Sequence, residues 1–313
     1  MDVSALVEGV LKGDTRAVAR SITAVEDGKP EAREILSALF PHGGRGLVVG
    51  LTGPPGAGKS TLADRLTARL RAQGKSVGVV AVDPTSPFSG GAILGDRIRM
   101  QGHAVDPGVF IRSMATRGHL GGLAAATDHV VTILSAAGKD VILVETVGVG
   151  QDEVEVVGTA DISLVVLVPG MGDEIQALKA GIMEIADVFV VNKADREGVE
   201  RVVAEIESML SLAPAGERPA IVRTVATRDE GIVELLAEVE TFRARAEAAG
   251  LLARKKRGQL RRQLEDAVQE RLMQAARTRV LSPDEIQRIV ERLEARELDP
   301  FTAADEVVRR MGL

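Results

Sequence analysis

The chain has 313 residues, of which 45% are hydrophobic, and its formal net charge is −6. This acidic balance disfavours a general binder of nucleic acids or membrane surfaces. The chain contains no Cys, which excludes disulfides, Cys-ligated metal centres and a Cys nucleophile. Its length allows one large domain with extensions, or two domains.

The N-terminus lacks the features of a signal peptide, because acidic residues occur early and no long apolar stretch follows. The longest apolar run, at 162–168, is far shorter than the roughly 20 residues that span a bilayer. We therefore expect a cytoplasmic protein that has neither a membrane nor a nucleic acid as its partner.

Three zones follow one another along the chain. Residues 1–45 predict an N-terminal helical extension, because apolar residues recur at helical spacing from Val3 to Val10 and again from Val18 to Val25. Residues 46–245 alternate between short, continuously apolar runs and helical stretches, which predicts a doubly wound, mostly parallel α/β sheet. Residues 246–313 predict a charged, helical C-terminal arm. The expected strands lie at 47–51, 77–82, 141–144, 162–168, 188–191 and 221–225, and the expected helices between them at 59–73, 121–137, 173–185 and 197–211.

One apolar stripe in the C-terminal arm has two interpretations. Leu260, Leu264, Val268 and Leu272 recur every four residues, as on one side of a helix. Such a helix packs on its own domain in one interpretation, and pairs with a second copy of the chain in the other.

A phosphate-binding loop follows the first expected strand. The segment GPPGAGKST fits the pattern G-x-x-x-x-G-K-[ST] between a strand and a helix. Its glycines permit a backbone path on which successive N–H groups converge on phosphate oxygens, and the positive end of the next helix points at the same anion. We expect Lys59 to neutralise the β- and γ-phosphates, Ser60 to ligate Mg²⁺ and Thr61 to contact the α-phosphate. The nucleotide-binding residues predicted here are Gly53, Pro54, Pro55, Gly56, Ala57, Gly58, Lys59, Ser60 and Thr61.

The base is predicted to be guanine. Asn192, Lys193 and Asp195 form an N-K-x-D sequence directly after an expected strand, where α/β sheets bind ligands. The Asp195 carboxylate can accept from the guanine N1–H and N2 amino groups, whereas adenine offers neither donor there. Lys193 can lay its aliphatic stem over the purine, and Asn192 would tie the loops together. Val225, Ala226 and Thr227, after the next strand, are the predicted second wall of the base site, with a backbone N–H for the guanine O6.

Two strand-end carboxylates, Asp83 and Glu145, are predicted to complete the Mg²⁺ shell, directly or through water. The N–H of Gly148 can contact the γ-phosphate and sense its loss. No Gln follows Gly148 immediately, so the usual water-positioning residue of small GTPases is missing, and Gln151 lies three residues further on. We therefore expect slow intrinsic hydrolysis that a partner stimulates.

These motifs, together with several longer stretches, resemble the methylmalonyl-CoA mutase-associated GTPases, the MeaB/ArgK family. The resemblance rests on GPPGAGKST at 53–61, VDPTSPFSGGAILGDRIRM at 82–100, ETVGVGQ at 145–151, GMGDEIQALKAGI at 170–182 and NKAD at 192–195. It spans nearly the whole chain, and the second stretch is the most specific. The resemblance implies a Mg²⁺-dependent GTPase that binds GTP and GDP. It further implies a metallochaperone, or G-protein chaperone, that gates adenosylcobalamin loading and protection of methylmalonyl-CoA mutase or a related acyl-CoA mutase.

The resemblance also implies roles for residues that the motifs alone leave undefined. Asp83 and Asp96 would belong to the first switch and the Mg²⁺ network, Glu145 to the second switch, and 170–182 to a third switch that meets the mutase. Family members are usually homodimers through the C-terminal arm. From the residues alone, 170–182 is only a polar helix start. The catalytic set is then Lys59, Asp96, Glu145, Asp173, Gln176 and Lys179, and the metal set is Ser60, Asp83, Asp96 and Glu145.

Three alternatives share the phosphate-binding loop. A nickel-insertion maturation GTPase needs Cys or His ligands, and the sequence has no Cys and no His cluster. A membrane-partitioning ATPase switch typically carries a Lys directly after the first glycine of the loop, where Pro54 stands here. A P-loop small-molecule kinase would need an acceptor pocket and a catalytic base, for which the sequence offers no candidate.

Overall fold

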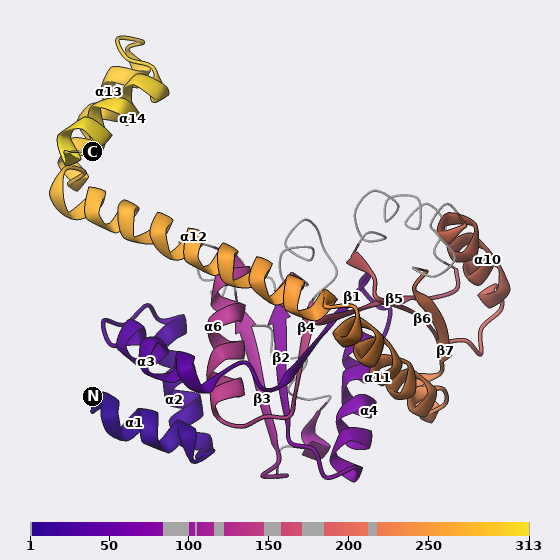
Figure 1. The fold of residues 1–313 in the computed structure, drawn as a ribbon. Helices are drawn as coiled ribbons and strands as arrows, with labels where there is room; N and C mark the ends of the chain where they lie inside the picture. Colours follow the sequence, from indigo (N-terminus) through magenta and orange to yellow (C-terminus); the bar gives the residue numbers. More distant parts are fainter. Residues whose placement is uncertain are drawn as a thin grey trace. The chain divides into compact units, whose positions relative to one another are not determined.

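The computed structural model describes residues 2–83, 100–103, 105–115, 122–146, 158–170, 185–211 and 218–312 (Figure 1). The chain divides into two compact units, Met1–Gln259 and Leu260–Leu313. Asp96, Gly148, Gln151, Asp173, Gln176 and Lys179, to which the sequence assigns roles, lie outside the described residues.

The first unit is built around a seven-stranded sheet in which every pairing is parallel. The strands lie in the order β3-β2-β4-β1-β5-β6-β7, so the chain begins the sheet in its middle and adds strands on both sides. This confirms the predicted doubly wound α/β fold. The strands are β1 (Leu47–Thr52), β2 (Val77–Asp83), β3 (Val109–Ala115), β4 (Val141–Thr146), β5 (Ile162–Leu167), β6 (Val188–Asn192) and β7 (Ala220–Thr224).

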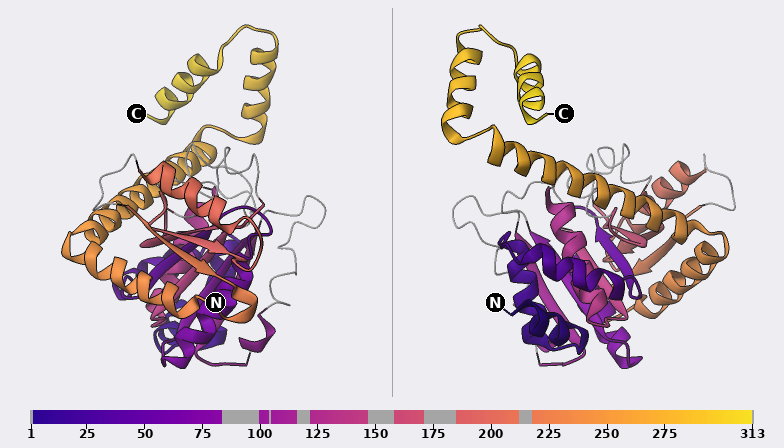
Figure 2. Two further views of the ribbon diagram at one scale, coloured as in Figure 1. Left: turned by 90° about the vertical axis from the view of Figure 1, so that its right-hand side faces the viewer. Right: turned by 60° about the vertical axis from the view of Figure 1, so that its left-hand side comes forward.

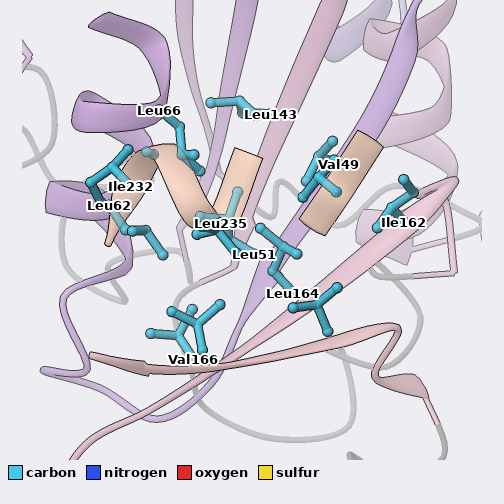
Figure 3. Packing of buried hydrophobic residues seen from close by; sticks show 14 of the residues in the cluster. Val49, Leu51, Leu62, Leu66, Leu143, Ile162, Leu164, Val166, Ile232 and Leu235 are labelled. Carbon is cyan, nitrogen blue, oxygen red and sulfur yellow. The ribbon is translucent and has the colours of Figure 1, made fainter. Parts of the chain in front are cut away.

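Helices cover both faces of this sheet. Alternate residues of one strand point to opposite faces, so Val49 and Leu51 of β1 belong to one apolar cluster, and Val48 belongs to another. Figure 3 shows the first cluster, where Leu62 and Leu66 of α4 (Lys59–Ala72) and Leu235 of α11 (Ile232–Ala248) meet the strands. The opposite face is covered by α6 (Gly122–Ala136) and, over β5 and β6, by α10 (Val199–Leu210).

The N-terminal helices pack against α6 (Figure 2). They are α1 (Val3–Leu11), α2 (Thr15–Glu26) and α3 (Ala32–Leu39). Asp2 and Asp14 cap the first two, each accepting a hydrogen bond from the N–H three residues later. On their apolar faces Val10 and Ile22 are fully buried and Val3 and Val7 partly buried, which confirms the helical spacing read from the sequence.

The strand β3 at the edge of the sheet was not predicted. Its sequence contains Arg112, which interrupts the kind of apolar run that marks β1, β4, β5 and β6. In the fold, Arg112 Nε donates to the Glu26 carboxylate on α2 at 3.0 Å, so the charge is paired against the helical layer. The last predicted strand also differs slightly, because β7 ends at Thr224 and Val225 forms an isolated bridge with Glu230.

The 29-residue helix α12 (Leu251–Arg279) begins on the first unit. Lys255 Nζ lies 2.6 Å from Asp187 Oδ2. The Gln259 side-chain amide donates to three consecutive carbonyl oxygens, those of Gly158, Thr159 and Ala160, at 3.2, 3.0 and 3.1 Å. Gln259, Thr159 and Ala160 are all buried, so this amide satisfies backbone acceptors in the interior.

The second unit continues α12 and adds α13 (Pro283–Glu294) and α14 (Pro300–Met311). An ion pair between Arg292 and Glu306, with 3.2 Å between Nη1 and Oε2, joins the last two helices. Apolar side chains of this unit lie on its surface: Leu260, Leu264, Val268 and Leu272 are 38%, 64%, 48% and 46% exposed. Across the described parts of the chain, no helix combines the length and the apolar character that a membrane crossing requires.

Candidate nucleotide-binding site

The loop between β1 and α4 requires its glycines. Gly53, Gly56 and Gly58 have φ values of +136°, +75° and +90°, which residues with a Cβ rarely adopt. A Cβ on Gly58 would lie 2.5 Å from Asn192 Nδ2, so the glycine also permits a close approach by the next loop. Because α4 begins at Lys59, the positive N-terminal end of this helix faces the loop, as in an anion site.

The Lys59 ammonium lies inside the loop. Its Nζ donates to the carbonyl oxygens of Gly53 and Pro54, with 3.0 Å to Pro54, and the residue is only 5% exposed. A buried cation at this position supplies the charge that a phosphate group requires.

The serine of the loop is bonded to the carboxylate that ends the neighbouring strand. Ser60 Oγ donates to Glu145 Oε1 at 2.6 Å, and both residues are buried. The pairing of β1 with β4 places Glu145 directly beside Leu51, just before the loop. The Asp83 backbone ends β2, which is the strand on the other side of β4, while its side chain is outside the described residues. Hydroxyl and carboxylate oxygens are the donor type that Mg²⁺ prefers, so this pair fits that ion.

Asn192 joins the three loops at this end of the sheet. Its Nδ2 donates to the Ala57 carbonyl oxygen at 2.8 Å. Its Oδ1 accepts from Thr224 Oγ1 and from the Ala226 N–H, both at 3.1 Å. The side chain is almost completely buried. The loops after β1, β6 and β7 are therefore held in one arrangement.

Lys193 and Asp195 lie on the exposed side of this junction. Lys193 has a φ of +57°, and its Nζ donates to the Gly56 carbonyl oxygen at 2.7 Å, so its stem spans from one loop to the other. Asp195 Oδ2 accepts from Arg228 Nη2 at 3.0 Å. Arg228 ends the short 3₁₀ helix η3 (Ala226–Arg228) after β7.

The structure thus brings together the loop at 53–61, Glu145, the N-K-x-D sequence and the segment at 225–227, all at the carboxyl ends of the strands. The sequence analysis did not predict the contact of Arg228 with Asp195. The available signal was that Arg228 directly follows 225–227, the predicted second wall of the base site.

A glycine-rich loop with its Lys, a buried Ser–Glu pair and an N-K-x-D loop on a parallel sheet define a P-loop GTPase, a protein that binds guanine nucleotides and hydrolyses GTP. Residues 18–280 match the family described as methylmalonyl Co-A mutase-associated GTPase MeaB, and the chain belongs to this family.

Similar proteins span nearly the whole chain. A putative GTPase of Pyrococcus abyssi is 48% identical, and the match covers 99% of this chain and 97% of that protein. The methylmalonic aciduria type A homolog of Mus musculus, a mitochondrial protein, is 34% identical over 98% of this chain and 79% of its own length. The crystal structure of an LAO/AO transport system kinase has a TM-score of 0.72 at 25% identity, covering 99% of this chain and 98% of that one.

Proposed function

We propose that this GTPase is a Mg²⁺-dependent G-protein chaperone that gates adenosylcobalamin loading and protection of methylmalonyl-CoA mutase, or of a related acyl-CoA mutase. The mutase is proposed as the partner because residues 18–280 match a family whose description names it. In this proposal, GTP hydrolysis changes the conformation of the switch loops, and this change alters how the protein interacts with the mutase.

The phosphate chemistry is assigned to the residues around the P-loop. Lys59 would neutralise the β- and γ-phosphates, and Thr61, in the first turn of α4, would contact the α-phosphate. Ser60 would hold Mg²⁺ directly, with Glu145 orienting a bound water from its place 2.6 Å from the serine hydroxyl. Mg²⁺, when bound, neutralises charge that develops on the phosphate oxygens. The proposed Mg²⁺ network also includes Asp83 and Asp96. The N–H of Gly148 would contact the γ-phosphate.

Guanine recognition is assigned to the loops after β6 and β7. The Asp195 carboxylate would accept from the N1–H and N2 amino groups, and the Lys193 stem would cover the purine face. The Ala226 N–H is already used by Asn192, at 3.1 Å. Within 225–227, the amide of Thr227 is therefore the better candidate donor to O6.

The third-switch segment at 170–182 carries the proposed coupling to the mutase through Asp173, Gln176 and Lys179. The support for these three roles is the sequence resemblance alone.

We also infer a homodimer through the C-terminal arm. The exposed stripe of Leu260, Leu264, Val268 and Leu272 supports this inference, because four apolar side chains at helical spacing on a surface are suited to pairing with a second helix.

The decisive experiment compares GTP hydrolysis by the protein alone and with an adenosylcobalamin-dependent acyl-CoA mutase. We expect slow basal turnover and a rate at least severalfold higher with the mutase. Lys179→Ala should reduce this stimulation, whereas Lys12→Ala, which removes an exposed lysine directly after α1, should not. An unchanged rate despite tight GTP binding would leave the GTPase assignment intact but would remove the mutase as the client.

A further inference from the structure

The ion pair between Arg228 and Asp195 lies at the proposed base site and has no role in the proposed function. Its two residues come from different loops and are 33 positions apart in the chain. Arg228 Nη2 lies 3.0 Å from Asp195 Oδ2, and the two side chains are 58% and 32% exposed. The pair is therefore formed at the surface, where an incoming nucleotide can reach it.

The backbone that carries each partner is fixed. The Ala194 N–H donates to the Thr224 carbonyl oxygen at 3.0 Å, which joins the Asp195 loop to the end of β7. On the other side, the Arg228 N–H donates to the Val225 carbonyl oxygen at 2.9 Å, and Asp229 ends η3 with a φ of +61°. Arg69 of α4 binds the Asp229 carboxylate. The pair can therefore be broken by rotation of the Arg228 side chain alone.

The two possible partners of Asp195 present the same kind of donors, although only one of them is charged. Guanine carries N1–H and the N2 amino group on one carbon, which is a guanidine unit within the base. The Arg228 side chain ends in a guanidinium group, which presents N–H donors in a planar fork. Asp195 Oδ2, which would accept one of the two guanine hydrogen bonds, is already occupied by such a donor.

We propose that Arg228 is an internal guanine mimic, which occupies Asp195 when no nucleotide is bound and must release it before guanine is recognised. This inference rests on the proposed function, because it requires Asp195 to be the guanine acceptor. Arg228 is then a positioning residue that keeps the carboxylate in place and lowers the apparent affinity for guanine nucleotides by competition.

The size of the effect follows from the exposure of the pair. An exposed ion pair shifts an equilibrium by a small factor, of about two to five. The apparent dissociation constant is the intrinsic one divided by the fraction of molecules in which Asp195 is available. Removing Arg228 should therefore strengthen GDP binding about two- to fivefold at low salt. The gain should shrink at high salt, because screening weakens the competing pair.

The test measures GDP and ADP binding to the nucleotide-free, full-length protein. The variants are Arg228→Gln, Arg228→Lys, which keeps the charge without the planar fork, and Asp195→Asn. Arg201→Gln is the matched control, because Arg201 is exposed and pairs with Glu205 within α10. Titrations would be run at about 20 mM and about 500 mM salt, on either side of strong screening.

We expect Arg228→Gln to tighten GDP binding at low salt, with a smaller gain for Arg228→Lys and none for Arg201→Gln. ADP binding should stay unchanged, because adenine presents no donors to Asp195. If Arg228→Gln binds GDP no more tightly than the wild type while Asp195→Asn clearly loses GDP affinity, Arg228 does not compete with guanine. Asp195 would then still be the guanine acceptor. If Asp195→Asn binds GDP as the wild type does, the proposed guanine acceptor and the mimic both fail.

Discussion

Asn192 Nδ2 lies 2.8 Å from the carbonyl oxygen of Ala57, so the loop after β6 is hydrogen-bonded directly to the phosphate-binding loop. The same side chain reaches Thr224 and Ala226 through its oxygen. The part of the site that faces the phosphates and the part that faces the base are thereby held at a fixed separation. Such an arrangement reduces the ordering that nucleotide binding must otherwise supply.

Asn192→Ala tests this junction. The substitution removes three hydrogen bonds and leaves the Ala226 N–H and the Thr224 hydroxyl without their acceptor in a buried place. A buried polar group without a partner costs about 1–3 kcal/mol. We expect the melting temperature to fall clearly. We also expect GDP affinity to fall at least about tenfold, which corresponds to roughly 1.4 kcal/mol of binding free energy. Calorimetric titration measures the GDP affinity, and a melting curve measures the thermal stability. If both equalled those of the wild type, Asn192 would not hold the loops in one arrangement.

Glu145→Gln tests the proposed metal network. The amide can still accept from Ser60 Oγ, so the local geometry is kept while the negative charge is lost. Groups that orient metal ligands typically contribute 10–100-fold to metal affinity or activity, and we expect a loss of about this size in Mg²⁺-dependent GTP hydrolysis.

Glu247→Gln is the control for this substitution, since Glu247 is half-exposed on α11 and pairs with Arg243. The readout is the dependence of the hydrolysis rate on Mg²⁺ concentration. If Glu145→Gln and Glu247→Gln gave the same Mg²⁺ dependence, Glu145 would have no part in the metal site.

Leu264→Glu tests the proposed dimer. Leu264 is the most exposed member of the apolar stripe of α12. In a paired arm its replacement would bury an unpartnered charge, which costs about 3–5 kcal/mol and should weaken dimerisation by at least about 100-fold. Light scattering over a range of protein concentrations measures this. Gln269→Glu adds the same charge at an exposed position outside the stripe and should leave the dimer intact; a wild-type protein that is monomeric throughout would refute the proposal.

Asp140 contributes to the stability of the folded state in a way that depends on pH. The backbone N–H and the hydroxyl of Ser76 both donate to its Oδ2 at 2.7 Å, and these hydrogen bonds lower the pKa of the carboxyl group. Because the folded pKa is below the ordinary value of 3.8, the stabilisation is complete above that value and is lost as the pH falls through the lowered pKa.

Asp140→Ala should therefore cost about 0.5–1.5 kcal/mol at neutral pH, as expected for hydrogen bonds at an exposed site. Urea unfolding of both proteins gives the difference in the free energy of unfolding, which should shrink as the pH is lowered below 3.8. Ser76→Ala removes the hydroxyl, with its contacts to Gly138 and Asp140, but keeps the backbone N–H donor to Oδ2, so part of the pH dependence should remain. A difference that stays constant down to the most acidic condition would contradict the role of the ionised carboxylate.

Much of the sheet could be predicted because five of its strands, β1, β2, β4, β5 and β6, are buried on both faces and read as largely apolar runs. The edge strand β3 could not, because Arg112 is compatible with a strand only once Glu26 of a distant helix is in place. Its charge is neutralised by tertiary structure, which no local pattern contains.

The same distinction applies to the site. The P-loop and the N-K-x-D sequence are local motifs, in which a few adjacent residues provide most of the geometry. The contacts of Arg228 with Asp195 and of Gln259 with the carbonyl oxygens before β5 join segments far apart in the sequence, with no characteristic spacing. Such contacts become visible only in the folded chain.

The three carbonyl oxygens bound by Gln259 also decide where this protein can be shortened. A chain that ended at Gly250 would retain every strand and the complete phosphate-binding loop, but it would expose the carbonyl oxygens of 158–160 without their donor. A chain that extended a turn beyond Gln259 would keep this amide inside a helix. A minimal nucleotide-binding version of the protein must therefore include the first part of α12, although that helix contributes no residue to the proposed nucleotide site.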